Sequence, residues 1–348
     1  MSQFIGIPKR KRSSLRRSVP IVAALALVSV GIAYAAHRVI HNAIERTGAE
    51  RYVNVLLNVP YGNFTMYAGT KPNRLALIET ITEDMENNPP LHYRYMLNSG
   101  AALGTLKVTL GADEGMLDNG QPLAYLANTG LTLASAGTLR TDWGDVLYSP
   151  PIQRSILGTN HSISNSDDNE RYQFYLTNEI PVSISAQFGF GESLMDWTGL
   201  QLASAYVETR ASTARITMKS PNQLPMSSCK VSAGFGSFQM DGICFLNASR
   251  YEFSGGIGSY KLNFNGKLQR NLDAIVEVGL GKVAIDIPPD AGRVQIFYDD
   301  SFFSSFQFQG LNKRREGYAT SVGFDQSKAP ILTLRLSTGM GKMEVRYK

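Results

Sequence analysis

Three residues near the N-terminus have a spacing that could bind a metal ion. His37, His41 and Glu45 lie four residues apart, which on a helix places them along one stripe. Imidazole and carboxylate groups in such an arrangement can share a cation. We favour the alternative, a polar stripe on a helix beside a membrane, because three ligands on one straight helix converge poorly on one ion. The sequence therefore predicts no metal site.

A second group of candidate residues consists of aspartates that could act as catalytic carboxylates. Asp286, Asp290, Asp299 and Asp300 are the densest carboxylates near an expected strand. Paired carboxylates cleave glycosidic bonds, so a β-helical enzyme acting on glycans is one interpretation. Only 18% of the residues are charged, and a group of this kind is usually a solvated face. We therefore predict no catalytic residues and no cofactor, and keep the glycan-active enzyme as an alternative.

Glycine pairs of the form Gly-x-Gly occur repeatedly and could suggest nucleotide binding. A dinucleotide-binding loop needs a helix directly after its glycines, because the helix N-terminus presents its amides to the pyrophosphate. In this chain each pair is followed by alternating apolar and polar residues, which is typical of a strand. The glycines are therefore interpreted as structural.

The two cysteines, Cys229 and Cys244, leave two alternatives open. In an exported chain two cysteines can form a disulfide. Cys229 also occupies an expected core-facing position, so the pair could instead be small buried thiols. The spacing does not decide between them, since a disulfide depends on the geometry of both Cα–Cβ bonds.

The stretch 272–287 shows most clearly what secondary structure carries the glycine pairs and the candidate residues. It has two runs of alternating apolar residues, each with the period of a strand that buries one face. The runs consist of Val276, Val278 and Leu280, then Val283, Ile285 and Ile287. The phase slips at Gly281-Lys282, so the chain must bulge or turn a corner there to keep both runs facing inward.

This strand–corner–strand pattern recurs along the chain. The expected corner glycines are Gly62, Gly104, Gly189, Gly191, Gly234, Gly236, Gly256, Gly258, Gly279, Gly281, Gly339 and Gly341. One further copy has Arg210 and Ser212 in place of its glycines, and the corners at 189, 210, 234, 256 and 279 are 21, 24, 22 and 23 residues apart. So small a unit cannot bury its own apolar face. An even period therefore predicts an all-β, single-stranded β-solenoid, whose ~22-residue rungs stack about 4.8 Å apart.

The N-terminal segments predict export. Residues 1–18 form a basic tail with six Lys and Arg side chains and no acidic residue, so the net charge of +5 leaves −1 for the rest of the chain. A charge confined to a tail argues against nucleic-acid binding, which needs basic residues on a folded face. Residues 19–36 carry no charge. They are expected to be a transmembrane helix with the tail in the cytoplasm, followed by a helical linker over 37–52. The alternative is a signal peptide cleaved near Ala35.

The remaining chain divides into two β regions. Residues 53–180 fit the pattern at irregular spacing and are interpreted as a decorated N-terminal part of the repeat. Residues 181–348 are the regular part, interrupted at 288–330. The interruption contains Phe302, Phe303, Phe306 and Phe308. It is expected to be a cap over the end of the stack or a terminal rung, with a partner-binding loop as the alternative.

The glycine pairs resemble the toast-rack, or β-strand-repeat, domain of bacterial envelope proteins. The resemblance extends to the run Leu268–Leu272 before the alternating strand and to the turn Pro288–Gly292 after it. The same repeat is found in the C-terminal domain of LiaF-type cell-wall-active-antibiotic response proteins. The resemblance implies an envelope-facing β-solenoid without catalysis. LiaF-type proteins usually have several membrane helices before this domain, whereas the N-terminal segments here predict a single-pass protein of the cytoplasmic membrane with its bulk outside. Such a protein would act as an envelope scaffold or adhesin-like module with a protein or glycan partner. A LiaF-like regulator of envelope stress is the alternative.

Overall fold

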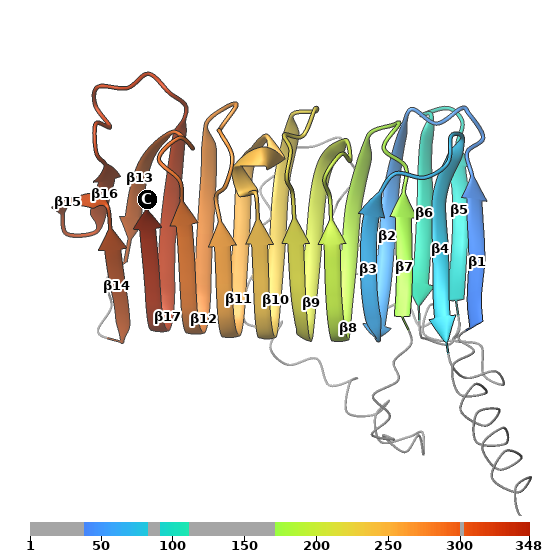
Figure 1. Cartoon of the computed structure of the whole chain (residues 1–348), viewed down its shortest axis with the longest axis horizontal. Coiled ribbons are helices and arrows are strands. Elements are labelled where there is room, and N and C mark those ends of the chain that lie inside the picture. Colours follow the sequence, from blue (N-terminus) through green and yellow to red (C-terminus); the bar gives the residue numbers. More distant parts are fainter. Residues whose placement is uncertain (1–37, 83–90, 111–170, 300–302) are drawn as a thin grey trace, which may run out of the picture.

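The protein is all-β, as the sequence predicts. The computed structural model describes residues 38–82, 91–110, 171–299 and 303–348. All 17 strands of the described residues belong to one hydrogen-bonded sheet, and their only helical element is the 3₁₀ turn η1 (Ile243–Leu246). Figure 1 shows the strands side by side along the long axis of the molecule.

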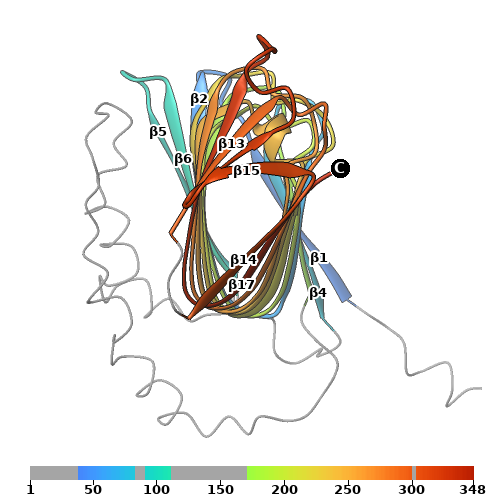
Figure 2. The same ribbon diagram turned by 90° about the vertical axis from the view of Figure 1, so that its left-hand side faces the viewer.

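Six long strands build the centre of the molecule. They are β8 (Val182–Asp196), β9 (Leu202–Thr217), β10 (Met226–Asp241), β11 (Ala248–Asn263), β12 (Leu272–Ile287) and β17 (Ile331–Tyr347). Neighbouring strands are parallel and in register, so that Gly236 lies opposite Gly258, Gly258 opposite Gly281, and Gly281 opposite Gly341. Each strand bends in its middle, and Figure 2, viewed along the stack, shows all the bends at the same level. We name each strand–bend–strand unit a rung.

The alternating apolar residues of both halves of each rung face the interior. In β11, Tyr251 and Phe253 before the bend and Tyr260 and Leu262 after it are all at most 2% exposed. The other rungs repeat this arrangement with Val276, Val278, Val283, Ile285 and Ile287 in β12. A single rung is one strand thick and cannot bury its own apolar side chains. The core therefore forms only when rungs stack, between the wall made of all first halves and the wall made of all second halves.

Each rung changes direction where the phase of the alternation slips. In β8, β10, β12 and β17 the bend contains a glycine with positive φ, a conformation that residues with a side chain rarely adopt. The values are +119° at Gly191, +127° at Gly236, +150° at Gly281 and +144° at Gly341. The slip turns the residue at the middle of each bend outward, such as Leu280 between Gly279 and Gly281. The prediction that Leu280 continues the buried run is therefore wrong, since its side chain is 44% exposed.

The N-terminal end of the stack does not follow chain order. It contains β1 (Arg38–Glu45), β2 (Tyr52–Tyr61), β3 (Asn63–Ala68), β4 (Arg74–Thr82), β5 (Leu91–Asn98), β6 (Leu103–Leu110) and β7 (Arg171–Leu176). Strands β2 and β3 form one rung that stacks on β8. Strands β6 and β7 pair with β2 and β3 from the other side and form a divided rung. The antiparallel strands β4, β1 and β5 complete the edge.

This arrangement corrects one expected corner. Gly104 lies opposite Val53 near the start of β2, not at the level of the bends. It follows the turn of the β5–β6 hairpin, in which Ala102 has a φ of +50°. The alternation after Gly104 is therefore the first half of a rung, whereas the sequence pattern suggested a second half.

The C-terminal end is also divided. Strand β17 stacks directly on β12, although 60 residues separate Gly279 from Gly339. The interruption at 288–330 contains β13 (Arg293–Tyr298), β14 (Ser304–Gln309), β15 (Leu311–Arg315) and β16 (Tyr318–Ser321). Strands β13 and β14 pair with the two halves of β17, and the β15–β16 hairpin pairs with β13. Phe306 and Phe308 pack against Tyr298 and the core, as expected of a terminal rung or cap.

The expected helical linker over 37–52 is wrong for the residues that the structure describes. Residues 38–45 form β1, which pairs with β4 and buries Ile44. Pairing with β4 stabilises the extended backbone, and Ile40 and Ile44 then lie on the same side of β1, where Ile44 joins the core. The predicted anchor over 19–36 lies outside the described residues, among which no helix is long and apolar enough to span a bilayer.

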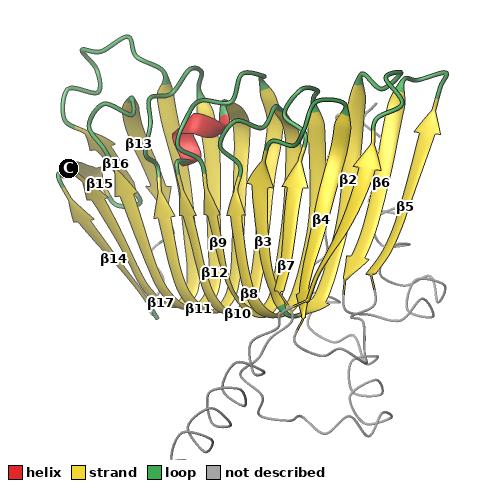
Figure 3. Cartoon of the chain, turned by 45° about the vertical axis from the view of Figure 1, so that its right-hand side comes forward, coloured by secondary structure: helices red, strands yellow, loops and turns green. Residues whose placement is uncertain are grey.

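The loops that connect successive rungs lie at the edge opposite the bends (Figure 3). Asn222 stabilises this edge from inside, where its side chain is 1% exposed. Its amide nitrogen donates to the carbonyl oxygens of Leu202, at 2.7 Å, and Leu224, at 2.9 Å, while its oxygen accepts from the amide of Leu202 at 3.0 Å. One side chain therefore ties neighbouring loops together.

Candidate functional site

The bend glycines allow the rungs to approach closely. A Cβ atom at Gly258 would lie 2.0 Å from the carbonyl oxygen of Gly236, and one at Gly281 would lie 2.0 Å from that of Gly258. The same relation joins Gly189 to Pro60 and Gly191 to Gly62. These glycines are thus packing residues. Strand β9 makes its bend with Arg210 and Ser212, neither of which has a positive φ.

The residues at the middle of the bends form a continuous apolar row on the surface, which we name the corner row. Its members, in spatial order, are Tyr61, Phe190, Ala211, Phe235, Ile257, Leu280 and Met340. Ala211 is half-buried, and the other six side chains are between 44% and 64% exposed. Seven strands about 4.8 Å apart make the row about 29 Å long. Contiguous exposed apolar surface of this kind marks interaction sites.

A second row, which we name the polar row, lies at or near the C-terminal ends of the six long strands, at the far end of their second halves from the bends. It consists of Asp196, Thr217, Asp241, Asn263, Asp286 and Arg346, each opposite the next. Arg346 Nη2 lies 2.8 Å from Asp286 Oδ2, and Arg215 Nη2 lies 2.8 Å from Asp241 Oδ2. The row therefore carries an aspartate on every second strand from β8 to β12, with a hydroxyl, an amide and finally a guanidinium group on the strands beside them.

Asp196 and Asp241 of the polar row are held in their charged form. Burial would by itself raise the pKa of Asp241, but hydrogen bonds from Asn263, Gln239 and Arg215 outweigh it, so this pKa lies below its usual range. The pKa of Asp196 is lowered in the same way, where Thr198 and Lys219 outweigh the effect of burial. Such groups bind and position other charges; a neutral carboxylic acid that could donate a proton is absent from these two sites at neutral pH.

An open pocket of about 300 Å³ lies at the polar row near the C-terminus. Its lining residues are Lys261, Asn263, Asn265, Asp286, Ile287, Pro288 and Lys348. Two lysines, two amides and one carboxylate can hydrogen-bond a polar ligand that carries hydroxyl or carboxylate groups. Asp286 is the one member of the predicted acidic group in this pocket.

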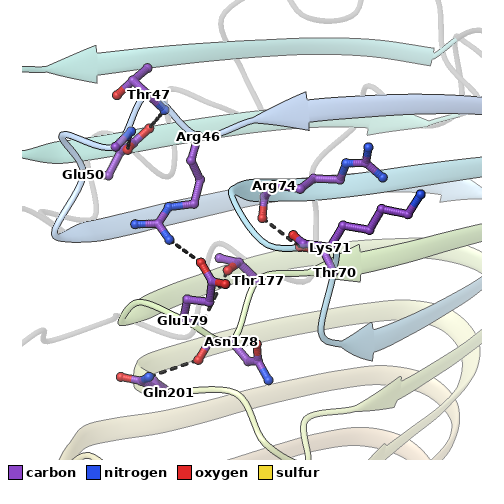
Figure 4. A network of polar contacts seen from close by, with 11 residues as sticks. Arg46, Thr47, Glu50, Thr70, Lys71, Arg74, Thr177, Asn178, Glu179 and Gln201 are labelled. Carbon is purple, nitrogen blue, oxygen red and sulfur yellow. Dashed lines mark hydrogen bonds and ion pairs between the residues drawn. The ribbon is translucent and has the colours of Figure 1, made fainter.

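Polar contacts fasten the N-terminal strands to the central rungs (Figure 4). Arg46, which follows β1, forms an ion pair with Glu179 between β7 and β8. Glu50 is 3% exposed and accepts hydrogen bonds from the backbone of Thr47 and from the hydroxyl of Tyr95. Burial would raise the pKa of Glu50, but these hydrogen bonds outweigh it and lower the pKa to about 2.

His41 and Glu45, for which the sequence predicts no metal site, each pair with a different residue. His41 Nδ1 lies 3.0 Å from Glu79 Oε1, and Glu45 Oε1 lies 3.1 Å from Arg74 Nε, while His37 is outside the described residues. No cluster of three or more His, Cys, Asp or Glu side chains suited to a metal occurs in the described part of the chain. Asp300, from the acidic group, is likewise outside it.

Both cysteines are free thiols in the core. Cys229, on β10, is 0% exposed, and Cys244, in η1, is 1% exposed. Burial raises the pKa of the Cys229 thiol to about 12, and burial with the nearby charge of Asp290 does the same for Cys244. Of the two alternatives, the structure has the buried thiols.

Sequence reasoning missed both surface rows. The apolar residue between two glycines was recognised as regular, but its outward orientation follows only from the phase slip at that position. The polar row was hidden because Asp196, Asp241 and Asp286 are about two rungs apart from one another in sequence. A signal was present in each case: a recurring residue type at a fixed distance from the bend.

Comparisons with known proteins leave the family open. No protein-family model and no curated protein matches the sequence. The chain is similar to a solved structure of a "putative cell adhesion protein" from Clostridium sporogenes, with 15% identity over 90% of this chain and 100% of that chain, and a TM-score of 0.38. A similarity at this level carries no argument about function, and the resemblance to the toast-rack repeat stays a proposal.

Proposed function

We propose that this chain is a membrane-anchored, extracytoplasmic β-solenoid of the toast-rack type that acts as a non-catalytic scaffold or binding module of the bacterial envelope. The solenoid assignment is supported by rungs that are parallel, in register and 21 to 24 residues apart from β8 to β12. Anchoring is supported by the uncharged residues 19–36 behind a basic tail.

The observation that carries the proposal is the repetition of surface positions from rung to rung. A stack of rungs presents the same position about every 4.8 Å, so a surface row offers many similar contacts at regular spacing. The polar row displays such contacts over β8 to β17. An extended polymer, such as a glycan or a peptide segment, can engage several of them at once, and weak individual contacts then add up.

Site-specific crosslinking of the full chain in native membranes tests the proposal. A photo-reactive residue is placed at Lys261, which is exposed and lines the pocket, and in a matched variant at Arg250, exposed on the other half of the same strand. We expect crosslinks to an envelope polymer or protein from position 261 and at least tenfold fewer from position 250, the ratio expected for a contact worth about 1.4 kcal/mol.

Other outcomes separate the alternatives. A sensor kinase as the crosslinked partner favours a LiaF-like regulator, and a cell-wall component favours the scaffold. Equal yields from the two positions would remove the polar row as the binding surface. A panel of polysaccharides incubated with the purified full chain tests catalysis, and cleavage of any of them would overturn the non-catalytic assignment.

A further inference from the structure

The corner row lies at the edge of the molecule where the chain enters the fold. Val39 of β1 pairs with Ile81, Ile81 with Arg171, and Arg171 with Asn63, which directly follows the bend glycine Gly62. The start of β1 is therefore level with the bends, and Figures 1 and 2 show both at the same edge. Val39 comes three positions after Ala36, the last residue of the uncharged segment. An extended chain of three residues spans about 10 Å at most.

We propose that the corner row rests on the lipid bilayer that holds the N-terminal segment, so that the stack lies along the membrane with its bends against the lipid. This inference rests on the anchoring part of the proposed function. If residues 19–36 end at the bilayer surface, the edge that contains the start of β1 faces that surface. The opposite edge, with the loops and the pocket, then points away from the membrane and stays open to a partner.

The chemistry of the corner row fits lipid. Its exposed members are aromatic or aliphatic, and glycines on both sides of Phe190, Phe235, Ile257, Leu280 and Met340 leave these side chains protruding. Tyrosine is enriched at the membrane interface, and Phe and Leu side chains are buried at the boundary between headgroups and acyl chains. A row about 29 Å long and one residue wide suits a flat apolar surface.

The charges beside the row include both signs. Arg210 and Lys282 are exposed next to the bends, and so are the acidic Glu192 and Glu277. These charges offset one another, so we commit to an apolar contact that does not require anionic lipid. The anchor raises the local concentration of bilayer around the row, so a modest intrinsic affinity suffices to hold the contact.

Electron paramagnetic resonance on the full-length protein in phosphatidylcholine vesicles tests this inference. A nitroxide is attached at Ile257→Cys and, as the matched control, at Gln269→Cys, an exposed loop position of the same rung at the opposite edge. The native thiols are buried and stay unlabelled. Oxygen enters the bilayer, whereas a polar nickel complex is excluded from it. The oxygen-to-nickel accessibility ratio should therefore be about tenfold higher at position 257 than at position 269.

Flotation of the vesicles separates failure of the anchor from failure of the inference. Protein that does not float with the vesicles overturns the anchoring and this inference together. Protein that floats but gives equal ratios at the two positions overturns the inference alone. A label at 257 that is shielded from both reagents and broadened by a second nitroxide shows that another copy covers the row, which also overturns it. A repeat with Phe235→Cys guards against a local effect at one rung.

Discussion

Alanine substitution of the bend glycines gives a graded test of the close stacking. Six of these glycines have ordinary φ angles, so a Cβ atom adds crowding without backbone strain, and four of the six form a graded series. The distance from that Cβ to the nearest carbonyl oxygen of the neighbouring rung falls from 3.1 Å at Gly279 to 2.6 Å at Gly234, 2.4 Å at Gly256 and 2.0 Å at Gly258. We expect the loss of stability to increase in the same order.

The largest effect can be worked out for Gly258→Ala. The neighbouring carbonyl must retreat by about 1.4 Å, from 2.0 Å to an ordinary contact of 3.4 Å. A displacement of this size lengthens the adjacent inter-rung hydrogen bonds beyond their normal limit of about 3.2 Å. Each backbone group that loses its partner costs about 1–3 kcal/mol. Two such groups, partly hydrated at the exposed bend, give an expected loss of about 3 kcal/mol.

Thermal unfolding of the four alanine variants measures this series. For a domain of this size 1 kcal/mol shifts Tm by about 2–4 °C, so Gly258→Ala should lower Tm by about 10 °C. Gly279→Ala should cost less than about 1 kcal/mol, in line with a small overpacking effect. The control is Gly100→Ala, where the nearest atom to the added Cβ is 3.6 Å away and no change is expected.

One result would refute the reasoning directly. If Gly258→Ala is no less stable than Gly279→Ala and Gly100→Ala, the carbonyl of the neighbouring rung does not approach the bend as closely as 2.0 Å from the added Cβ. A uniform loss across all four variants would point instead to lost backbone flexibility in the unfolded chain.

Three further predictions concern the interior. The pKa of Glu50 lies at about 2, below its ordinary 4.5. Its stabilising effect is therefore present above pH 4.5 and lost as the pH falls towards 2, so Glu50→Gln should flatten the fall of Tm over this range; an unchanged slope would contradict this. Cys229 and Cys244 should not react with Ellman's reagent in the folded protein, whereas both should react in guanidinium; a native mass two hydrogens lower would reveal a disulfide instead. Asn222→Ala should lower the free energy of unfolding by about 2–4 kcal/mol in urea titrations, because it leaves the buried backbone groups of Leu202 unpaired, and a loss below about 1 kcal/mol would contradict the bonding described.

The strand edge at β1 shows how local patterns can mislead. Val39, Ile40, Ala43 and Ile44 continue the apolar N-terminal segment and fit a helix as well as a strand. The partner strand β4 lies further along the chain, and only its hydrogen bonds select the extended form. Strand preference is largely a property of the neighbours, so a single segment could not reveal it.

The class of fold and the identity of the core were determined by the sequence itself. Alternation with period two and a phase slip at each glycine pair are local properties, and they correctly predicted buried residues such as Val276, Val283 and Ile285. The even spacing from 189 to 279 likewise predicted which glycines would align, since equal units stack in register.

Only the tertiary structure decided the order of the outer rungs and the character of the surface. Nothing local states that β17 pairs with β12, or that β2 and β3 pair with β8, because the hydrogen-bonding edge of a strand accepts any strand of suitable shape. The exposure of Leu280 was hidden for a related reason: an apolar residue at a bend looks the same in sequence whether it points inward or outward. Its direction is set by the backbone angles of the adjacent glycines, and these exist only once the rungs have stacked.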